Sequence, residues 1–128
     1  MKNIEEAEKM LGMAVKDLRA ASAMNDIEDF PDEIFGFHAQ QAVEKALKGW
    51  LSYKLVVYPK THDLEILFLL LKKQNENIPE NFDSLVDLVD FAVEFRYNYF
   101  EEDIPIDRKI TCQIILELLN YINNKIKE

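Results

Sequence analysis

The chain has 128 residues, and 48% of them are hydrophobic, so a single domain (residues 1–128) can bury a core without disulfides or a structural metal. With 24 acidic and 15 basic residues the formal charge is -9, which opposes broad contact with nucleic-acid phosphates, and we expect RNA binding to be weak or absent. The start MKNIEEAEKM lacks the pattern of a secretory signal, Cys112 is a lone cysteine, and the longest apolar run is far short of the ~20 residues that span a bilayer, so we expect a cytoplasmic protein without a membrane segment.

Two long helices are predicted in the first part of the chain. A helix from about Glu5 to Met24 is indicated by apolar residues at alternating steps of three and four, as in a helix packed nearly parallel to its neighbours. These residues are Ile4, Ala7, Leu11, Ala14, Leu18 and Ala21. Pro31 and the acids around it then favour a loop and a second helix from about Asp32 to Tyr53. The core-facing arc of the second helix is predicted to contain Phe35, Ala39, Ala42, Val43, Ala46 and Trp50.

The rest of the chain predicts three more helices joined by loops. LVVY is read as a connector, after which Thr61 is a good N-cap for a helix from about Thr61 to Lys73. A fourth helix is predicted over about Asp83–Tyr97, on an arc of Leu85, Leu88, Val89 and Ala92. A fifth begins near Asp107, with Ile110, Ile114, Leu118 and Ile122 in line. We therefore expect an all-α fold, an antiparallel four-helix-type bundle with one additional short helix.

The second helix carries polar residues that its core side does not require. His38, Gln41, Lys45 and Lys48 share a separate arc at steps of three or four, so that their side chains can converge on one target. Phe37 and Leu51 are placed beyond this strip, on the face opposite the core. One interpretation is a solvated face with Phe37 covered by a loop. The other is a contact surface, with Phe37, Lys48 and Leu51 as candidate interface residues.

Two further places hold polar residues with open roles. Arg96 falls within the apolar arc of the fourth helix, which indicates an ion pair with Asp63 or Glu44, a guanidinium that escapes to solvent, or a cleft that recognises phosphate. In THDL, capping accounts for Thr61 and Asp63 and leaves His62 free.

Metal and cofactor sites are not predicted. The two histidines, His38 and His62, and the single cysteine lack the close spacing of a zinc site. The acidic run Glu101, Glu102 and Asp103 has the chemistry to hold a hard cation, but such a run in a loop is normally only solvated.

Three motifs together resemble the HEPN domain family over nearly the whole chain. They are FHAQQAVEKALKGWL, then PKTHDL, and then an apolar helix ending in FRYNYF. The resemblance implies an all-α bundle, usually dimeric, that occurs in prokaryotes beside minimal nucleotidyltransferases in toxin–antitoxin pairs or defence systems.

Many HEPN members are metal-independent ribonucleases whose motif is an Arg, a polar residue directly after it, and a His a short distance further on. Arg96 matches the Arg, but Tyr97 replaces the polar residue, and Glu101, Glu102 and Asp103 stand where the His is expected. Without an imidazole no group of near-neutral pKa can move the 2′-hydroxyl proton, and carboxylates repel the phosphate. This member is therefore predicted not to cleave RNA.

The resemblance instead implies a non-catalytic binding module, homodimeric, which associates with a nucleotidyltransferase and binds a nucleotide. Its candidate ligand-binding residues are His38, Gln41, Lys45, His62, Asp63 and Arg96. We assign Arg96 and Lys45 to a phosphate, the histidines to hydrogen bonds, and Asp63 to orienting a neighbour. The alternatives are a toxin-type ribonuclease with displaced catalytic residues, and a plain scaffold whose polar strip is internal ion pairing.

Overall fold

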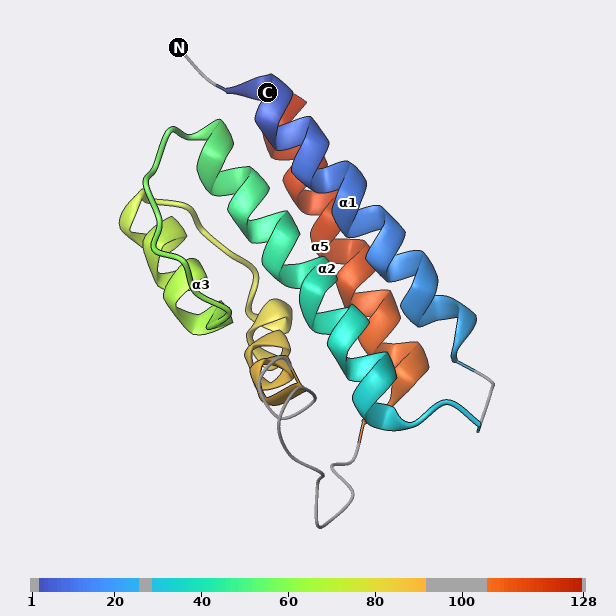
Figure 1. The fold of residues 1–128 in the computed structure, drawn as a ribbon. Helices are drawn as coiled ribbons and strands as arrows, with labels where there is room; N and C mark the ends of the chain where they lie inside the picture. The colour runs from blue at the N-terminus through green and yellow to red at the C-terminus, as the bar shows by residue number, and fades with distance from the viewer. Residues whose placement is uncertain (1–2, 26–28, 92–105, 128) are drawn as a thin grey trace.

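The computed structural model describes residues 3–25, 29–91 and 106–127, and these residues form an antiparallel helical bundle (Figure 1). The elements in chain order are α1 (Ile4–Ala23), α2 (Asp32–Tyr53), α3 (Leu64–Lys73), the 3-10 helix η1 (Glu80–Leu88) and α5 (Arg108–Lys127). No strand occurs among the residues that are described, so the predicted all-α class is confirmed. None of the described helices is long and apolar enough to cross a membrane.

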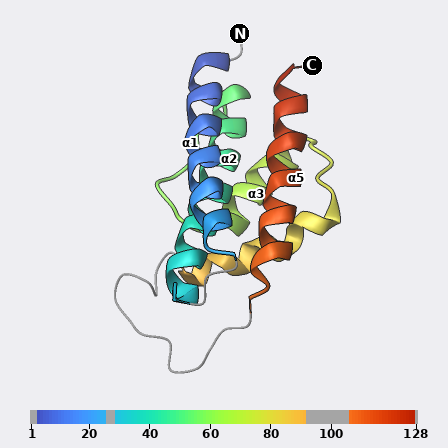
Figure 2. The ribbon, with the colours of Figure 1, turned by 90° about the vertical axis from the view of Figure 1, so that its right-hand side faces the viewer.

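Helix α2 is the centre of the bundle. It contacts α1 and α5 on one side and α3 and η1 on the other. Figures 1 and 2 show the same arrangement, with α1 and α5 side by side and α3 and η1 beyond α2. Helix α1 runs antiparallel to α2 and α5, which brings the two chain ends to the same end of the bundle. A helix surrounded in this way must be apolar, or internally paired, on most of its circumference.

The predicted core of α1 and α2 agrees closely with the structure. All residues of the predicted α2 arc are buried, and in α1 the residues Ala7, Ala14, Leu18 and Ala21 are buried. Leu11 packs partly against the core, whereas Ile4 at the helix start is 48% exposed. Asn3 caps α1, because its side-chain oxygen accepts a hydrogen bond from the Glu6 amide at 3.1 Å.

The segment predicted to form a fourth α-helix from Asp83 begins as a 3-10 helix, which ends at Leu88, and residues 89–91 are α-helical as predicted. Its buried residues are Phe82, Leu85 and Leu88, and Phe91 follows at the same spacing. A 3-10 helix has three residues per turn, so residues three apart lie in one line, and this geometry places Phe82, Leu85 and Leu88 against the core. The residues from 92 to 97 of the predicted helix lie outside the described part of the chain.

The start of α5 is tied to the connection between α1 and α2 by Arg108. Its guanidinium donates to the backbone oxygens of Met24 at 2.8 Å and Phe30 at 2.6 Å, and to the Asp32 carboxylate at 2.8 Å. The same group lies 5.4 Å from the Phe35 ring centre. The planar fork of arginine suits several acceptors at once, so Arg108 fixes the end of the bundle at which α5 begins.

In α5 the expected core residue Ile110 is instead 58% exposed.

Candidate functional site

The polar side of α2 is organised around a buried carboxylate, Glu44, which is 5% exposed. Its Oε1 accepts hydrogen bonds from Gln40 Nε2 at 2.9 Å and from His62 Nδ1 at 2.8 Å. Its Oε2 accepts a hydrogen bond from Lys48 Nζ at 3.0 Å. Gln40 also donates to the His62 backbone oxygen at 3.2 Å, so the connector before α3 is fastened to α2 at two points. We call Gln40, Glu44, Lys48 and His62 the Glu44 cluster.

Glu44 is ionised despite its burial. Loss of hydration raises the pKa of this carboxyl, but hydrogen bonds from Gln40, His62 and Lys48, with the positive charge of Lys48, together lower that pKa below its ordinary value. An ionised carboxylate can only accept hydrogen bonds. The proton of the contact with His62 therefore sits on Nδ1 of the imidazole.

A second carboxylate, Asp17 of α1, organises the neighbouring part of α2. Lys45 Nζ lies 2.5 Å from Asp17 Oδ2, and His38 Nδ1 lies 3.2 Å from Asp17 Oδ1. The Asp17 side chain is 15% exposed, so it is mostly enclosed by the groups it holds. We call Asp17, His38 and Lys45 the Asp17 cluster, and it links α1 to α2 by charge.

The four residues of the predicted polar strip do not converge on one target, so that prediction is wrong. His38 and Lys45 contact Asp17, whereas Lys48 contacts Glu44. Gln41 donates to the Gln40 side-chain oxygen at 2.8 Å and so joins the strip to the Glu44 cluster. The strip divides because its residues contact two different carboxylates. Asp17 belongs to the neighbouring helix α1, whereas Glu44 belongs to α2 itself.

The THDL segment is also arranged differently from the prediction. Asp63, not Thr61, is the N-cap of α3, because its Oδ1 accepts a hydrogen bond from the Glu65 amide at 3.0 Å. Thr61 supports this turn by accepting from the Asp63 amide at 3.0 Å. His62 is not free, since Glu44 holds its Nδ1, but its side chain remains 44% exposed.

The candidate interface Phe37, Lys48 and Leu51 does not form an exposed face. Leu51 is 0% exposed and the side chain of Lys48 is 14% exposed in its pair with Glu44, whereas Phe37 is half-buried and meets the His38 ring edge-on. The prediction assumed that one side of the second helix faces solvent. Because α2 has neighbours on both sides, Leu51 offers no surface to another chain.

Some predicted residues lie outside the described ranges, and some important ones were missed. Arg96 and the acids Glu101, Glu102 and Asp103 belong to the part that is not described. The missed residues are Gln40 and Asp17, with Glu44 considered only as a partner for Arg96. The steps of four from Gln40 to Glu44 and from Glu44 to Lys48 were the available signal, because such residues are neighbours on a helix.

Among the comparisons with known proteins, a protein-family model gives a match. Neither the curated proteins nor the solved structures include a match to the chain. The family model described as the HEPN domain matches residues 7–128. This match covers all of the described helices apart from the first residues of α1, and it includes both carboxylate clusters. The chain therefore belongs to the HEPN domain family.

Proposed function

We propose that this protein is a non-catalytic HEPN-domain binding module that associates with a separately encoded minimal nucleotidyltransferase and binds a nucleotide on the polar side of α2. The observation that carries the proposal is the pair of carboxylates, Asp17 and Glu44, which hold His38, Lys45 and His62 in fixed positions while leaving each of them partly exposed. Side chains that are held in place before a ligand arrives lose little conformational entropy on binding.

These residues retain donors and acceptors for a ligand. The ammonium group of Lys45 has three N–H donors, and the contact with Asp17 uses one of them. The Nε2 edge of His62 is turned away from its contact with Glu44 and belongs to a side chain that is 44% exposed. Two carboxylates balance two lysines here, so recognition depends on directed hydrogen bonds more than on net charge. Arg96 is proposed to add the bidentate phosphate contact.

The proposal of a non-catalytic module rests on the sequence after Arg96. Acids occupy positions 101, 102 and 103, where the ribonucleases of the family carry a histidine. A carboxylate at ordinary pKa is already ionised at neutral pH and is a poor proton donor to a leaving group. Binding without cleavage is the function that this composition favours.

Nucleotide binding is tested by thermal unfolding of the purified chain with nucleoside mono-, di- and triphosphates. A ligand at 100 times its dissociation constant stabilises a protein by about 2.7 kcal/mol, so a rise in melting temperature is expected. Lys45→Met should abolish that rise, whereas Lys72→Met, on the exposed end of α3, should leave it intact. If no nucleotide raises the melting temperature of the wild-type chain, nucleotide binding is refuted.

Association with a nucleotidyltransferase is tested separately, by co-expression with the product of an adjacent nucleotidyltransferase gene and size-exclusion chromatography. Co-elution at a fixed stoichiometry supports the proposal. Independent elution of the two proteins contradicts it, whatever the nucleotide experiment gives.

A second function, metal-independent RNA cleavage with displaced residues, is favoured by one observation. The contact between His62 Nδ1 and the buried Glu44, at 2.8 Å, orients an imidazole in the way that a general base is oriented. Incubation with mixed RNA in the presence of a chelator decides between the two functions. Cleavage that is lost in both His62→Ala and Arg96→Ala would replace the binding module with an enzyme.

A further inference from the structure

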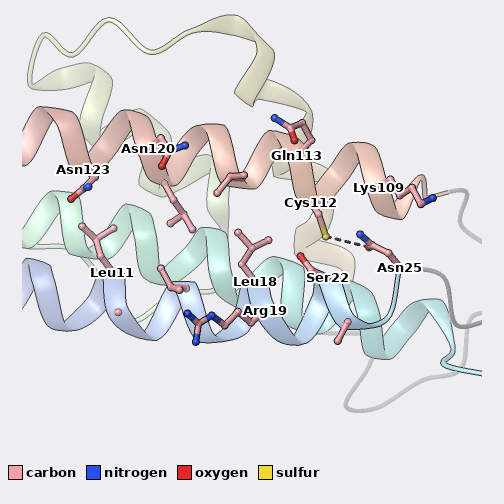
Figure 3. Close-up of a pocket in the computed structure, with 15 residues that line it drawn as sticks. Leu11, Leu18, Arg19, Ser22, Asn25, Lys109, Cys112, Gln113, Asn120 and Asn123 are labelled. Atoms are coloured by element: carbon pink, nitrogen blue, oxygen red, sulfur yellow. Dashed lines mark hydrogen bonds between the residues drawn. The ribbon is translucent and has the colours of Figure 1, made fainter.

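A groove with a volume of about 860 Å³ runs between α1 and α5, on the side of the bundle away from α3 (Figure 3). Leucine side chains of both helices form its floor, and Val15 of α1 and Leu116 of α5, which also line it, are 39% and 44% exposed. The residues of the Glu44 cluster and the Asp17 cluster lie outside its lining. The groove is therefore a different surface from the polar side of α2, on which the proposed function depends.

The α5 edge of the groove is an exposed stripe with steps of four and three, the steps that keep residues on one face of a helix. Three of its five members carry a side-chain amide, and none is acidic although the chain has a net charge of -9. The stripe consists of Lys109, Gln113, Leu116, Asn120 and Asn123. This edge therefore offers mainly neutral hydrogen-bonding groups, interrupted by one leucine.

The two asparagines of this stripe are not used inside the chain. Asn120 and Asn123 make no hydrogen bond with the described part of the protein. Asparagine is also one of the less favourable residues within a helix, because its short amide competes with the backbone for hydrogen bonds. Neither helix stability nor internal bonding accounts for these residues. An amide side chain carries donors and an acceptor on one group, so it can pair with a peptide group in either sense.

The α1 edge of the groove has open space at Gly12. A Cβ atom placed on Gly12 meets nothing within 4 Å, whereas a Cβ on Gly36 would lie 2.3 Å from the Phe91 ring and one on Gly49 would lie 3.0 Å from Met10. A glycine in a helix interior is unfavourable relative to alanine, and at Gly12 no internal contact requires it. Gly12 therefore leaves room for the close approach of another backbone.

Positive charge accompanies this open space. Arg19 lies on the same edge, seven positions after Gly12 or about 10.5 Å along the helix, and makes no ion pair within the described ranges of the chain. Figure 3 shows Arg19 and Asn120 on opposite edges, with leucine side chains between the two helices. Lys109 adds a second positive charge, and none of the described lining residues is Asp or Glu. An occupant that carries carboxylates is therefore favoured.

We infer that this groove binds an extended acidic peptide segment of another protein, whose backbone pairs with the asparagine amides and whose carboxylate pairs with Arg19. An extended chain leaves its own N–H and C=O groups unpaired, so a groove that holds it must supply donors and acceptors. A docked helix has already satisfied its backbone and needs an apolar groove alone. The row of amides on α5 thus distinguishes the two kinds of occupant.

The length of the groove sets the size of the segment. Lys109 and Asn123 are 14 positions apart on α5, which corresponds to about 21 Å. An extended chain advances ~3.3–3.6 Å per residue, so about six residues cover this length. An apolar side chain of the segment would lie between Val15 and Leu116. This inference goes beyond the proposed function and does not depend on nucleotide or nucleotidyltransferase binding.

Selection of phage-displayed random peptides of about ten residues on the immobilised wild-type chain tests the inference, because this length covers the groove. The enriched peptides are synthesised, and their dissociation constants are measured by fluorescence anisotropy. Each enriched sequence should combine an acidic residue with an apolar one. The bound peptide should add no helical signal to the circular dichroism spectrum of the chain.

Substitution of the two asparagines separates a role in binding from a role in folding. Asn120→Leu combined with Asn123→Leu should raise the dissociation constant about tenfold or more, because several hydrogen bonds are lost while the helix is retained. Asn124→Leu is the matched control, since Asn124 is exposed on α5 but does not line the groove. In spectra of isotope-labelled wild-type chain, the side-chain amide resonances of Asn120 and Asn123 should shift on addition of peptide, and those of Asn124 should stay.

Reversal of the charge on α1 tests the carboxylate contact. Arg19→Glu should also weaken binding about tenfold or more, because it places like charges opposite one another. Lys16→Glu is the control for this change, since it alters the net charge equally on an exposed part of α1 outside the groove.

Three results would overturn the inference. One is a selection from which no peptide binds the wild-type chain. Another is a bound peptide that is helical and insensitive to the asparagine double variant, which would make the groove a helix-docking site. The third is binding that Arg19→Glu and Lys16→Glu affect equally, which would remove the directed contact with a carboxylate.

Discussion

The polar side of α2 and the outer face of α1 are both rich in charged residues, but their charges are used differently. On α2, Glu44, Gln40 and Lys48 are mostly enclosed. Each of His38, Lys45, Lys48 and the more exposed His62 contacts a carboxylate. On α1, charged residues flank an exposed glycine without ion pairs in the described part of the chain. The first region joins α2 to α1 and to the connector before α3, whereas the charged residues of the second are exposed.

These two regions show that an unusual sequence motif need not form an exposed surface. The motif FHAQQAVEKALKGWL attracts notice because polar residues interrupt an apolar helix, yet many of those residues satisfy one another within the fold. The α1 sequence has an ordinary amphipathic pattern. The exposed glycine of this helix stands out only when the groove and the empty space around Gly12 are known.

Removing the carboxylate of the Glu44 cluster should have the largest effect. Glu44→Ala leaves Gln40, Lys48 and His62 without their shared acceptor, and removal of one partner of a buried pair lowers the free energy of unfolding by about 3 kcal/mol. Urea unfolding followed by circular dichroism measures this change. Glu65→Ala, an exposed acid in the first turn of α3, is the control, with an expected loss of about 0.5 kcal/mol. Equal losses in the two variants would mean that the cluster is not a structural centre.

Adding a methyl group at Gly36, one of the two buried glycines of α2, should also destabilise the chain. In Gly36→Ala the new Cβ would lie 2.3 Å from the Phe91 ring, which is itself 2% exposed and has little room to move. Overpacking of this kind lowers the free energy of unfolding by about 1–3 kcal/mol, which outweighs the better helix propensity of alanine. The same urea experiment applies, and a stabilised variant would show that Phe91 is not held in its position.

Acid should weaken the wild-type chain more than a Glu44→Gln variant. The folded-state pKa of Glu44 is lowered relative to the ordinary value of 4.5, so its ionised form adds stability above that value, and the contribution is lost as the pH falls through the folded-state pKa. The advantage of the wild type over Glu44→Gln should therefore shrink between about pH 7 and about pH 3. A difference that stays constant over this range would show that Glu44 does not titrate in this way.

The smallest effect is expected at the exposed glycine of α1, and it has the opposite sign. In Gly12→Ala the new Cβ meets no atom within 4 Å, and the free energy of unfolding measured in urea should rise by about 0.5–1 kcal/mol. Gly36→Ala provides the matched comparison, because the substitution is identical and only the surroundings differ. Destabilisation by Gly12→Ala would indicate an internal contact at that position.

Much of the fold was predictable because helix periodicity is a local property of the sequence. The predicted second helix, from about Asp32 to Tyr53, has the bounds of α2, and the steps of three and four in α1 identified most of its buried residues. The errors occurred where several elements meet. Leu51 was predicted to be exposed, and Thr61 was predicted to be the cap of α3, because neither neighbours on both sides of α2 nor the choice between two adjacent capping residues can be read from periodicity.

The sequence by itself determined the all-helical class, the family, and the polar residues that exceed what a helix core needs, since each depends on residue types and their spacing along one segment. Only the tertiary structure decided how those residues are used. Asp17 and His38 are 21 positions apart, and Glu44 and His62 are 18 apart, so each contact exists only because the helices pack as they do. The groove beside Gly12 likewise arises from the packing of α1 against α5, which are the first and last helices of the sequence.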